Sequence, residues 1–112
     1  MRGRELENWS AVVLARHGYD IEQNPKVPGS KRPDYLIEGL VFDHMAPTTP
    51  RAWNIWSRVG KKMSERQATK IVLNIDGNKA RMDDLQKQFR RPLPNLEKVL
   101  VIRRGDVRQL FP

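Results

Sequence analysis

One segment constrains the fold more than any other. Residues 68–75 have the sequence ATKIVLNI, an apolar run rich in β-branched residues. Such a run is typical of a central strand whose two faces are both covered by other elements. The turn residues Asp76, Gly77 and Asn78 follow it directly. We therefore expect a β-sheet with this strand in its core.

Three other segments predict helices. Residues 4–17 carry apolar side chains around most of a helical wheel and are followed by Gly18, so they predict a largely buried first helix. Residues 51–67 place their apolar side chains on one stripe, which predicts an amphipathic second helix. Residues 81–91 predict a third helix that stops before Pro92.

The expected strands complete an α/β pattern. They are residues 19–25, 34–38, 41–45, 98–104 and 106–111. Gly39 and Leu40 separate one pair and predict a type II′ hairpin turn, whereas Gly105 and Asp106 separate the closing pair. The sequence thus predicts a single α/β domain over residues 1–112, with a central mixed β-sheet flanked by about three helices.

Composition limits the partners and the metal chemistry. Lys and Arg number 21 against 13 Asp and Glu, a net charge of +8 that favours nucleic acid and is also compatible with an acidic protein partner. Cys is absent and His occurs twice, so a hard cation such as Mg²⁺ fits better than zinc. No apolar run approaches the roughly 20 residues that span a bilayer, so we expect no membrane insertion by this domain.

Two carboxylates fall on the expected hairpin. If the turn is Gly39 and Leu40, Leu36 faces Asp43, and Asp34 lies diagonal to Asp43 on the same face. Diagonal neighbours lie about 7–8 Å apart, so the two side chains can share one cation. A hard divalent ion held by carboxylates can polarise a phosphodiester and acidify an attacking water. The pair therefore predicts metal-dependent phosphodiester hydrolysis.

Two further side chains join this hypothesis. Lys62 shares a helical row with Ile55 and Val59, which directs it toward the core side, while Lys61 faces solvent. Glu7 lies between Ala11 and Leu14 on the first helix, where a carboxylate has to pair or bind a metal.

Ordinary alternatives remain open for each of these residues. The two aspartates can be surface positions of a half-exposed sheet, Lys62 can be solvated, and Glu7 can stabilise the helix dipole. His44 can act as a general base in a metal-free ribonuclease, but strand alternation directs it to the face opposite Asp43.

Four segments together resemble a known family. They are KRPDYLIEGLVFDHMAPTT, IWSRVGKK, QATKIVLNI and the closing VIRRGDVRQLFP. In order and spacing they resemble the C-terminal tRNA-nuclease domains of contact-dependent growth inhibition (CdiA) toxins, and the wider PD-(D/E)XK nuclease fold. The resemblance implies a secreted or cell-surface effector that acts in the cytoplasm of a target bacterium, with tRNA as substrate and a cognate immunity protein as partner. The net charge of +8 predicts that this immunity protein is acidic.

The same resemblance assigns roles to residues. It implies that Asp34 and Asp43 supply the acidic signatures and that Glu7 is a third metal-site carboxylate. Met45 stands where the wider fold has lysine, and Lys62 from the following helix takes that place. Glu7, Asp34, Asp43 and Lys62 are therefore the expected catalytic residues, and the three carboxylates are the expected ligands of Mg²⁺ or another divalent cation.

Basic residues outside the site are expected to contact phosphates. Lys31 and Arg32 precede the first acidic strand, and the third helix and its end carry Arg81, Lys87, Arg90 and Arg91. Two alternatives to a tRNA nuclease stay open. One is a DNA endonuclease of the same fold, and the other is a non-catalytic nucleic-acid-binding module.

Overall fold

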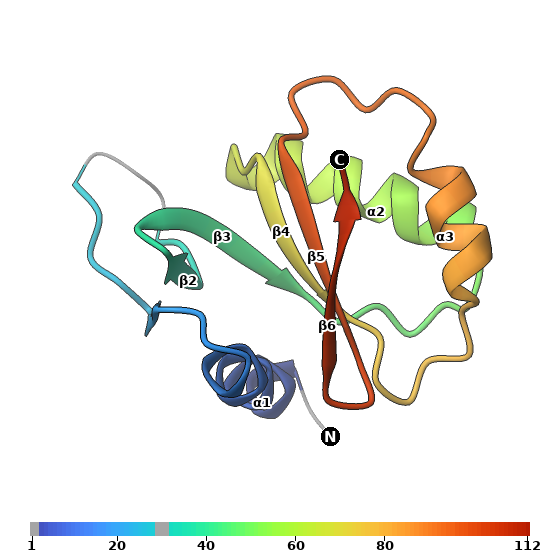
Figure 1. The fold of residues 1–112 in the computed structure, drawn as a ribbon. Helices are drawn as coiled ribbons and strands as arrows, with labels where there is room; N and C mark the ends of the chain where they lie inside the picture. The colour runs from blue at the N-terminus through green and yellow to red at the C-terminus, as the bar shows by residue number, and fades with distance from the viewer. Residues whose placement is uncertain (1–2, 29–31) are drawn as a thin grey trace.

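Six strands form one mixed sheet in the computed structural model, which describes residues 3–28 and 32–112. The chain order is α1 (Gly3–Arg16), β1 (Ile21–Gln23), β2 (Tyr35–Ile37), β3 (Leu40–Met45), α2 (Ala52–Arg66), β4 (Lys70–Asn74), α3 (Met82–Gln88), β5 (Lys98–Arg103) and β6 (Asp106–Phe111). The strands lie side by side in chain order (Figure 1). Pairs β3–β4 and β4–β5 are parallel, and the other neighbours are antiparallel. The expected α/β fold with a mixed sheet and three helices is confirmed.

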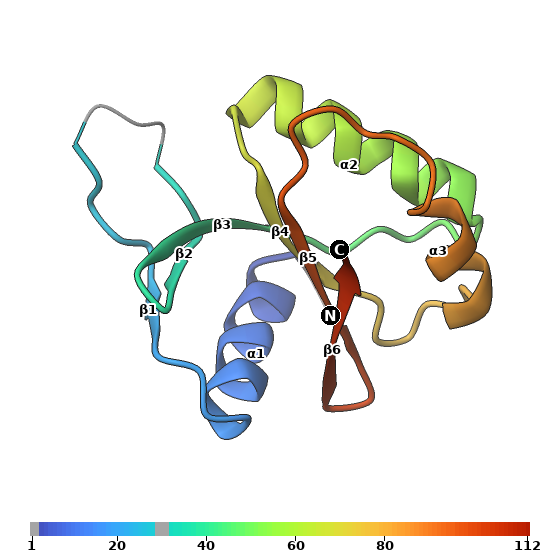
Figure 2. The same cartoon turned by 45° about the horizontal axis from the view of Figure 1, so that its top comes forward.

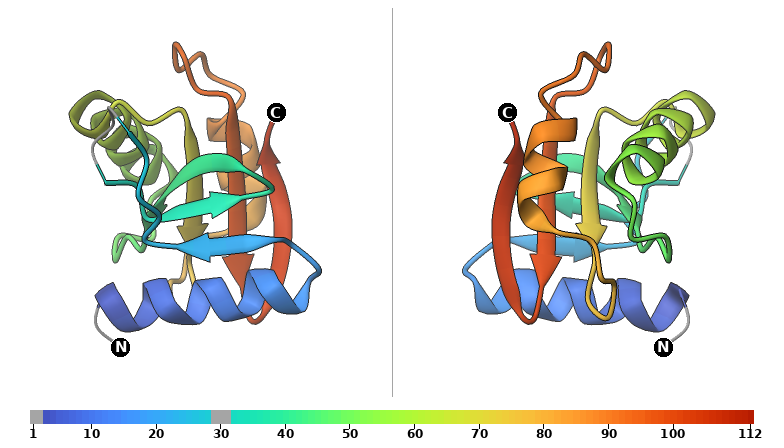
Figure 3. Two further views of the ribbon diagram at one scale, coloured as in Figure 1. Left: turned by 90° about the vertical axis from the view of Figure 1, so that its left-hand side faces the viewer. Right: turned by 90° about the vertical axis from the view of Figure 1, so that its right-hand side faces the viewer.

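Helices cover both faces of the sheet. α1 lies on one face, where Val13 and Leu14 pack against Tyr35, Phe42 and strand residues of β4 and β5. α2 and α3 lie on the other face, above β4 and β5 (Figure 2). Figure 3 shows α1 crossing the direction of these strands. β4 is therefore the doubly covered central strand that its sequence predicts, because Ile71 to Asn74 are all buried.

The expectation of a largely buried first helix is wrong. α1 rests on a single face of the sheet, so one side buries Ser10, Val13 and Leu14 while the opposite side is open to solvent. Val12 is 42% exposed although it is apolar. Apolar side chains around most of a helical wheel do not show on how many sides the helix is covered by other elements.

The expected register of the β2–β3 hairpin is also wrong, by two residues. Tyr35 pairs with Phe42 and Ile37 with Leu40, so the turn is Glu38–Gly39. Both turn residues have positive φ, 52° and 78°, which defines a type I′ turn with glycine in second place. Glu38 is fixed there because its N–H donates to the Asp20 carbonyl, and its carboxylate accepts the Asp20 N–H. Continuing this register places Asp34 directly opposite Asp43.

The closing hairpin shows the same shift. β5 and β6 join through Arg104 and Gly105, with φ of 52° and 74°, and not through Gly105 and Asp106. The Arg104 N–H donates to a carboxylate oxygen of Asp76, which holds this turn against the loop after β4.

None of the helices within the described ranges is long and apolar enough to cross a membrane.

Candidate active site

Asp34 and Asp43 hold each other in place through backbone groups. The Asp34 N–H donates to Asp43 Oδ1 at 3.2 Å, and the His44 N–H donates to Asp34 Oδ2 at 2.8 Å. Asp34 lies immediately before β2, and Asp43 lies in the middle of the neighbouring strand β3. The expected register places them on one face as diagonal neighbours, and the observed register, continued by one pair, makes them direct neighbours.

Asp43 is almost fully buried and has a cationic partner. Its side chain is 4% exposed, and Oδ2 lies 3.5 Å from Arg66 Nε. A second nitrogen of the Arg66 guanidinium donates to the carbonyl oxygen of Arg32. Arg66 thus connects the end of α2, the middle of β3 and the segment that leads into Asp34. A buried carboxylate needs such a partner because burying it alone would be very costly.

A surface cavity of about 460 Å³ opens beside Asp34. Its lining residues are Glu7, Asp34, His44, Met45, Ala46, Pro47, Arg58, Lys61, Lys62 and Glu65. Glu7 of α1, and Asp34 immediately before β2, therefore share one cavity with cations from α2. Three of the four expected catalytic residues, Glu7, Asp34 and Lys62, line it, and Asp43 lies behind Asp34.

Glu7 is held at this cavity from the opposite face of the sheet. The Tyr35 hydroxyl donates to the Glu7 carbonyl oxygen at 2.5 Å and so joins α1 to β2. Burial raises the pKa of the Glu7 carboxyl, and the negative charge of Asp34 raises it further, whereas Lys62 opposes the shift. Glu7, Asp34 and Lys62 therefore lie within electrostatic reach of one another.

Lys62 is directed at the acidic wall, as its helical row predicts. It is half-buried, and its positive charge acts to lower the pKa of both Glu7 and His44. Lys61, in contrast, is exposed and pairs with Glu65 at 3.8 Å. The prediction that Lys61 is the solvated member of the pair is confirmed.

His44 belongs to a buried network on the α1 face. Its Nε2 lies 2.9 Å from Ser10 Oγ, which also accepts a hydrogen bond from Asn74 Nδ2 at 2.7 Å. Burial lowers the pKa of His44 to about 4, and the nearby Lys62 lowers it as well. The imidazole is therefore neutral at pH 7 and ties α1 to β3 and β4, on the face opposite Asp43 as predicted.

This histidine makes stability depend on pH. Its pKa is lower in the folded protein than the 6.5 of a free imidazole, so the unfolded chain binds a proton first as pH falls. We expect the free energy of unfolding in EDTA to fall by about 2–3 kcal/mol more between pH 7.5 and pH 4.5 in the wild type than in His44→Gln. Urea titrations measure this difference. Equal losses in the two proteins would contradict the assignment.

The predicted phosphate-contact residues separate into two groups. Arg32 is exposed, and its carbonyl is bound by Arg66 beside the site. Arg81, Lys87, Arg90 and Arg91 are also exposed, but they surround α3, which lies beside the N-terminal half of α2 (Figures 1 and 2). They do not line the acidic cavity. Lys31 lies outside the described residues.

Arg58 and Arg66 are site residues that the sequence analysis did not select. Arg66 lies one helical turn after Lys62, so the row that identified Lys62 contained the signal for Arg66. Arg58 lies one turn before Lys62 and lines the same cavity. Helix periodicity alone does not show which basic residues of α2 face β3.

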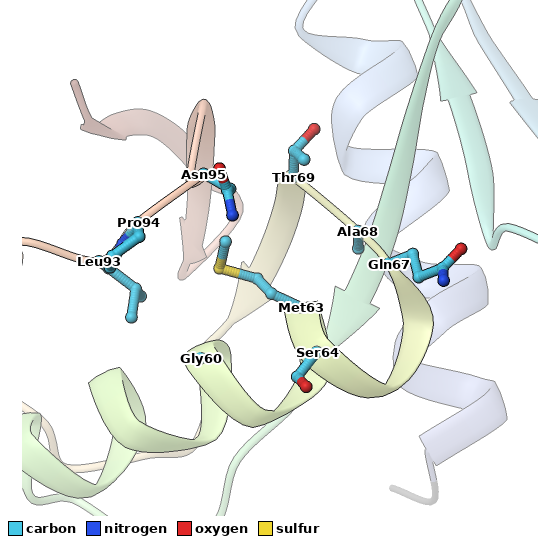
Figure 4. Close-up of a pocket in the computed structure, with 9 residues that line it drawn as sticks. All are labelled: Gly60, Met63, Ser64, Gln67, Ala68, Thr69, Leu93, Pro94 and Asn95. Carbon is cyan, nitrogen blue, oxygen red and sulfur yellow. The ribbon is translucent and has the colours of Figure 1, made fainter.

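A second cavity on another side of α2 has different chemistry (Figure 4). It measures about 440 Å³ and is lined by Gly60, Met63, Ser64, Gln67, Ala68, Thr69, Leu93, Pro94 and Asn95. It lacks carboxylates, imidazoles and basic side chains. Gly60 lets Leu93 approach the helix, since a Cβ there would lie 3.1 Å from Leu93 Cδ1. Only the first of the two cavities has side chains suited to acid–base chemistry.

The fold and the acidic cavity together define a small α/β domain in which carboxylates and cations line one open cavity. The chain belongs to the contact-dependent growth inhibition CdiA C-terminal domain family, which it matches over residues 31–107.

Two relatives extend this comparison. The tRNA nuclease CdiA-2 of Burkholderia pseudomallei (strain 1026b) is 46% identical over 97 residues, which are 86% of this chain and 3% of that protein. The chain therefore spans a small part of that relative. A solved CdiA-CT/CdiI toxin and immunity complex from Burkholderia pseudomallei is similar with a TM-score of 0.91 and 43% identity, over 96% of this chain and 83% of that chain.

Proposed function

We propose that this domain is a toxin ribonuclease that cleaves tRNA, and that the cavity bounded by Glu7, Asp34 and Lys62 is its active site. The observation that carries the proposal is the meeting of these three side chains, from α1, the residue before β2, and α2, in one open cavity. The tRNA substrate is inferred from the relative named a tRNA nuclease, at 46% identity.

Each site residue has a distinct part in hydrolysis. Lys62 is half-buried and faces the negative wall, so its ammonium stabilises the charge that develops on the scissile phosphate. Burial and the charge of Asp34 raise the pKa of the Glu7 carboxyl, which makes its carboxylate a stronger base for the proton of the attacking water. The water oxygen bonds to phosphorus as its proton passes to Glu7, the P–O bond to the leaving oxygen breaks, and the leaving oxygen takes a proton from the solvent. Asp34 orients the water, and Asp43 orients Asp34 by accepting its N–H.

The donor set fits Mg²⁺. Within residues 3–28 and 32–112, no three His, Asp or Glu side chains converge as a ready set of metal ligands. Mg²⁺ keeps several waters and is commonly held by one or two carboxylates together with substrate phosphates. Glu7 and Asp34 would be the carboxylates, and the RNA would supply the phosphate. Bound there, the ion would polarise the phosphate and acidify a water. Asp43, with Arg66 on one of its oxygens, remains a proposed third ligand.

The order of elements supports a PD-(D/E)XK-like assignment. Pro33 and Asp34 immediately precede β2, and Asp43 lies in β3, within the run α1-β1-β2-β3-α2-β4. Met45 lines the cavity at the usual lysine position of that signature, and Lys62 from α2 supplies the cation. We propose that the domain is a variant of this nuclease fold in which the lysine comes from the helix.

The biological setting follows from the family. We propose that the domain is part of a secreted or cell-surface effector and acts in the cytoplasm of a target bacterium. A cognate immunity protein is its second partner, as supported by the similar toxin and immunity complex. Because the domain carries a net charge of +8, an acidic immunity protein would be attracted to it. The same charge attracts tRNA, with Lys31, Arg32 and the basic residues around α3 as proposed phosphate contacts.

The substrate and the metal are tested together. The domain is incubated with total cellular RNA or with supercoiled plasmid, in Mg²⁺ or in EDTA, and the products are separated on denaturing gels. We expect discrete tRNA fragments with Mg²⁺, and intact tRNA in EDTA because the carboxylates then lack their cation. Cleavage of the plasmid with intact tRNA would identify a DNA endonuclease. Intact nucleic acid in every lane would contradict the nuclease assignment.

A further inference from the structure

The three cations that line the acidic cavity differ in what they contact. Lys62 is directed toward Glu7 and His44, and Lys61 pairs with Glu65. Arg58 lies on the exposed rim, and within the described ranges its guanidinium makes no hydrogen bond or ion pair. Arg58 can therefore bind a ligand without first losing a hydrogen bond or an ion pair to another described residue.

Arg58 also lies at a useful distance from the reacting centre. It precedes Lys62 by four residues, so the two side chains leave α2 on the same side, about 6 Å apart along the helix axis. Glu7 and His44 respond to the charge of Lys62, whereas Arg58 is not among the charges that shift their pKa values. Arg58 thus lies one turn of α2 before Lys62, at the rim of the same cavity.

The remaining wall of the cavity leaves few places for a second phosphate. Met45, Ala46 and Pro47 form its apolar part, which suits a ribose or a base better than a charged group. Glu65 repels phosphate and holds Lys61. A planar guanidinium can bind two phosphate oxygens at once, and an exposed arginine can do so without a large desolvation cost.

From this arrangement we propose that Arg58 forms a phosphate subsite, which binds the phosphodiester next to the one being cut in an RNA strand. The inference rests on the proposed ribonuclease function, because it takes the scissile phosphate to lie between Asp34 and Lys62. Arg58 positions the strand and takes no part in the bond-breaking step.

The test measures tRNA binding in a protein that does not cut. Asp34→Asn is the background, since it keeps every cation of the cavity. The dissociation constant for tRNA is measured for three proteins: the background alone, the background with Arg58→Ala, and the background with Arg108→Ala. Salt is varied between about 50 and 200 mM, a range in which phosphate contacts dominate the salt dependence of binding. Arg108 is the matched control because it is an exposed arginine on β6 whose loss lowers the net charge equally.

We expect Arg58→Ala to weaken tRNA binding by about tenfold at low salt. It should also reduce the slope of log Kd against log salt by about 0.7 to 0.9, the loss of one phosphate contact. Arg108→Ala should change both quantities much less. In proteins that retain Asp34, Arg58→Ala should raise KM for tRNA and leave kcat within about twofold.

Two results would overturn the subsite. One is equal salt slopes and affinities in Arg58→Ala and Arg108→Ala, and the other is a fall in kcat with no change in KM. Failure of the ribonuclease function is separate, because it would appear as uncut tRNA in the wild type while the binding comparison still gives its own answer.

Discussion

The Lys62→Met variant is expected to cut tRNA about 10²–10³-fold more slowly than the wild type, which is the usual cost of removing one group that stabilises transition-state charge. Lys62 is half-buried and directed at the wall that carries Glu7 and Asp34. Methionine keeps most of the length and apolar volume of the side chain, so the loss would report the charge and not the packing. Single-turnover cleavage of total tRNA measures the rate.

The neighbouring lysine provides the control. Lys61 carries the same charge but is exposed and pairs with Glu65. Exposed ion pairs of this kind contribute little to stability. We expect Lys61→Met to lower the cleavage rate by no more than about threefold. If the two variants cut at similar rates, Lys62 is not the catalytic cation and the assignment of the cavity is wrong.

Asp34→Asn and Asp43→Asn should both lower cleavage by about 10²-fold or more, because each removes a carboxylate from the proposed hydrolytic site. They should differ in stability. An asparagine at position 34 can still accept the His44 N–H, so we expect little change in the free energy of unfolding. An asparagine at position 43 leaves the Arg66 guanidinium without its charged partner, which should cost about 2 kcal/mol.

Urea unfolding of the two variants, measured in EDTA beside the cleavage assay, separates these roles. The combination of lost activity and unchanged stability identifies Asp34 as a group that acts on substrate or metal. If Asp43→Asn instead cuts tRNA at the wild-type rate, then Asp43 serves only to hold Arg66, and its place among the catalytic residues is contradicted.

Local sequence patterns predicted most of the fold, because a strong periodicity of apolar residues is compatible with few arrangements of helices and strands. The apolar run of β4 marks a doubly covered strand, and the single stripe of α2 marks a helix on one face of the sheet. The hairpin turns were each displaced by one residue. In both, the residue before glycine, Glu38 or Arg104, adopts positive φ. Bonds to Asp20 and Asp76 stabilise these turns, and such partners are distant in sequence.

The sequence predicts those parts of the candidate site that depend on the alternation of side chains along a strand or on their rows along a helix. Asp34 and Asp43 share a face of the sheet in the expected register and in the observed one, because the two registers differ by an even number of residues. The helical row also directed Lys62 inward. Arg66 and Arg58 were missed because their partners, Asp43 and the open cavity, exist only after α2 packs beside β3. The helical row of Lys62 includes Arg66, but the row alone does not show that Asp43 is the partner of Arg66.

In the proposed mechanism, α1 brings Glu7 into one active site with Asp34 and Lys62. The most direct measurement compares tRNA cleavage by Glu7→Gln with that by Glu5→Gln, an exposed glutamate of the same helix. We predict that Glu7→Gln loses cleavage while its free energy of unfolding is at least that of the wild type, because burial and Asp34 disfavour the Glu7 charge. Glu5→Gln should cut normally. Wild-type cleavage by Glu7→Gln would contradict the account.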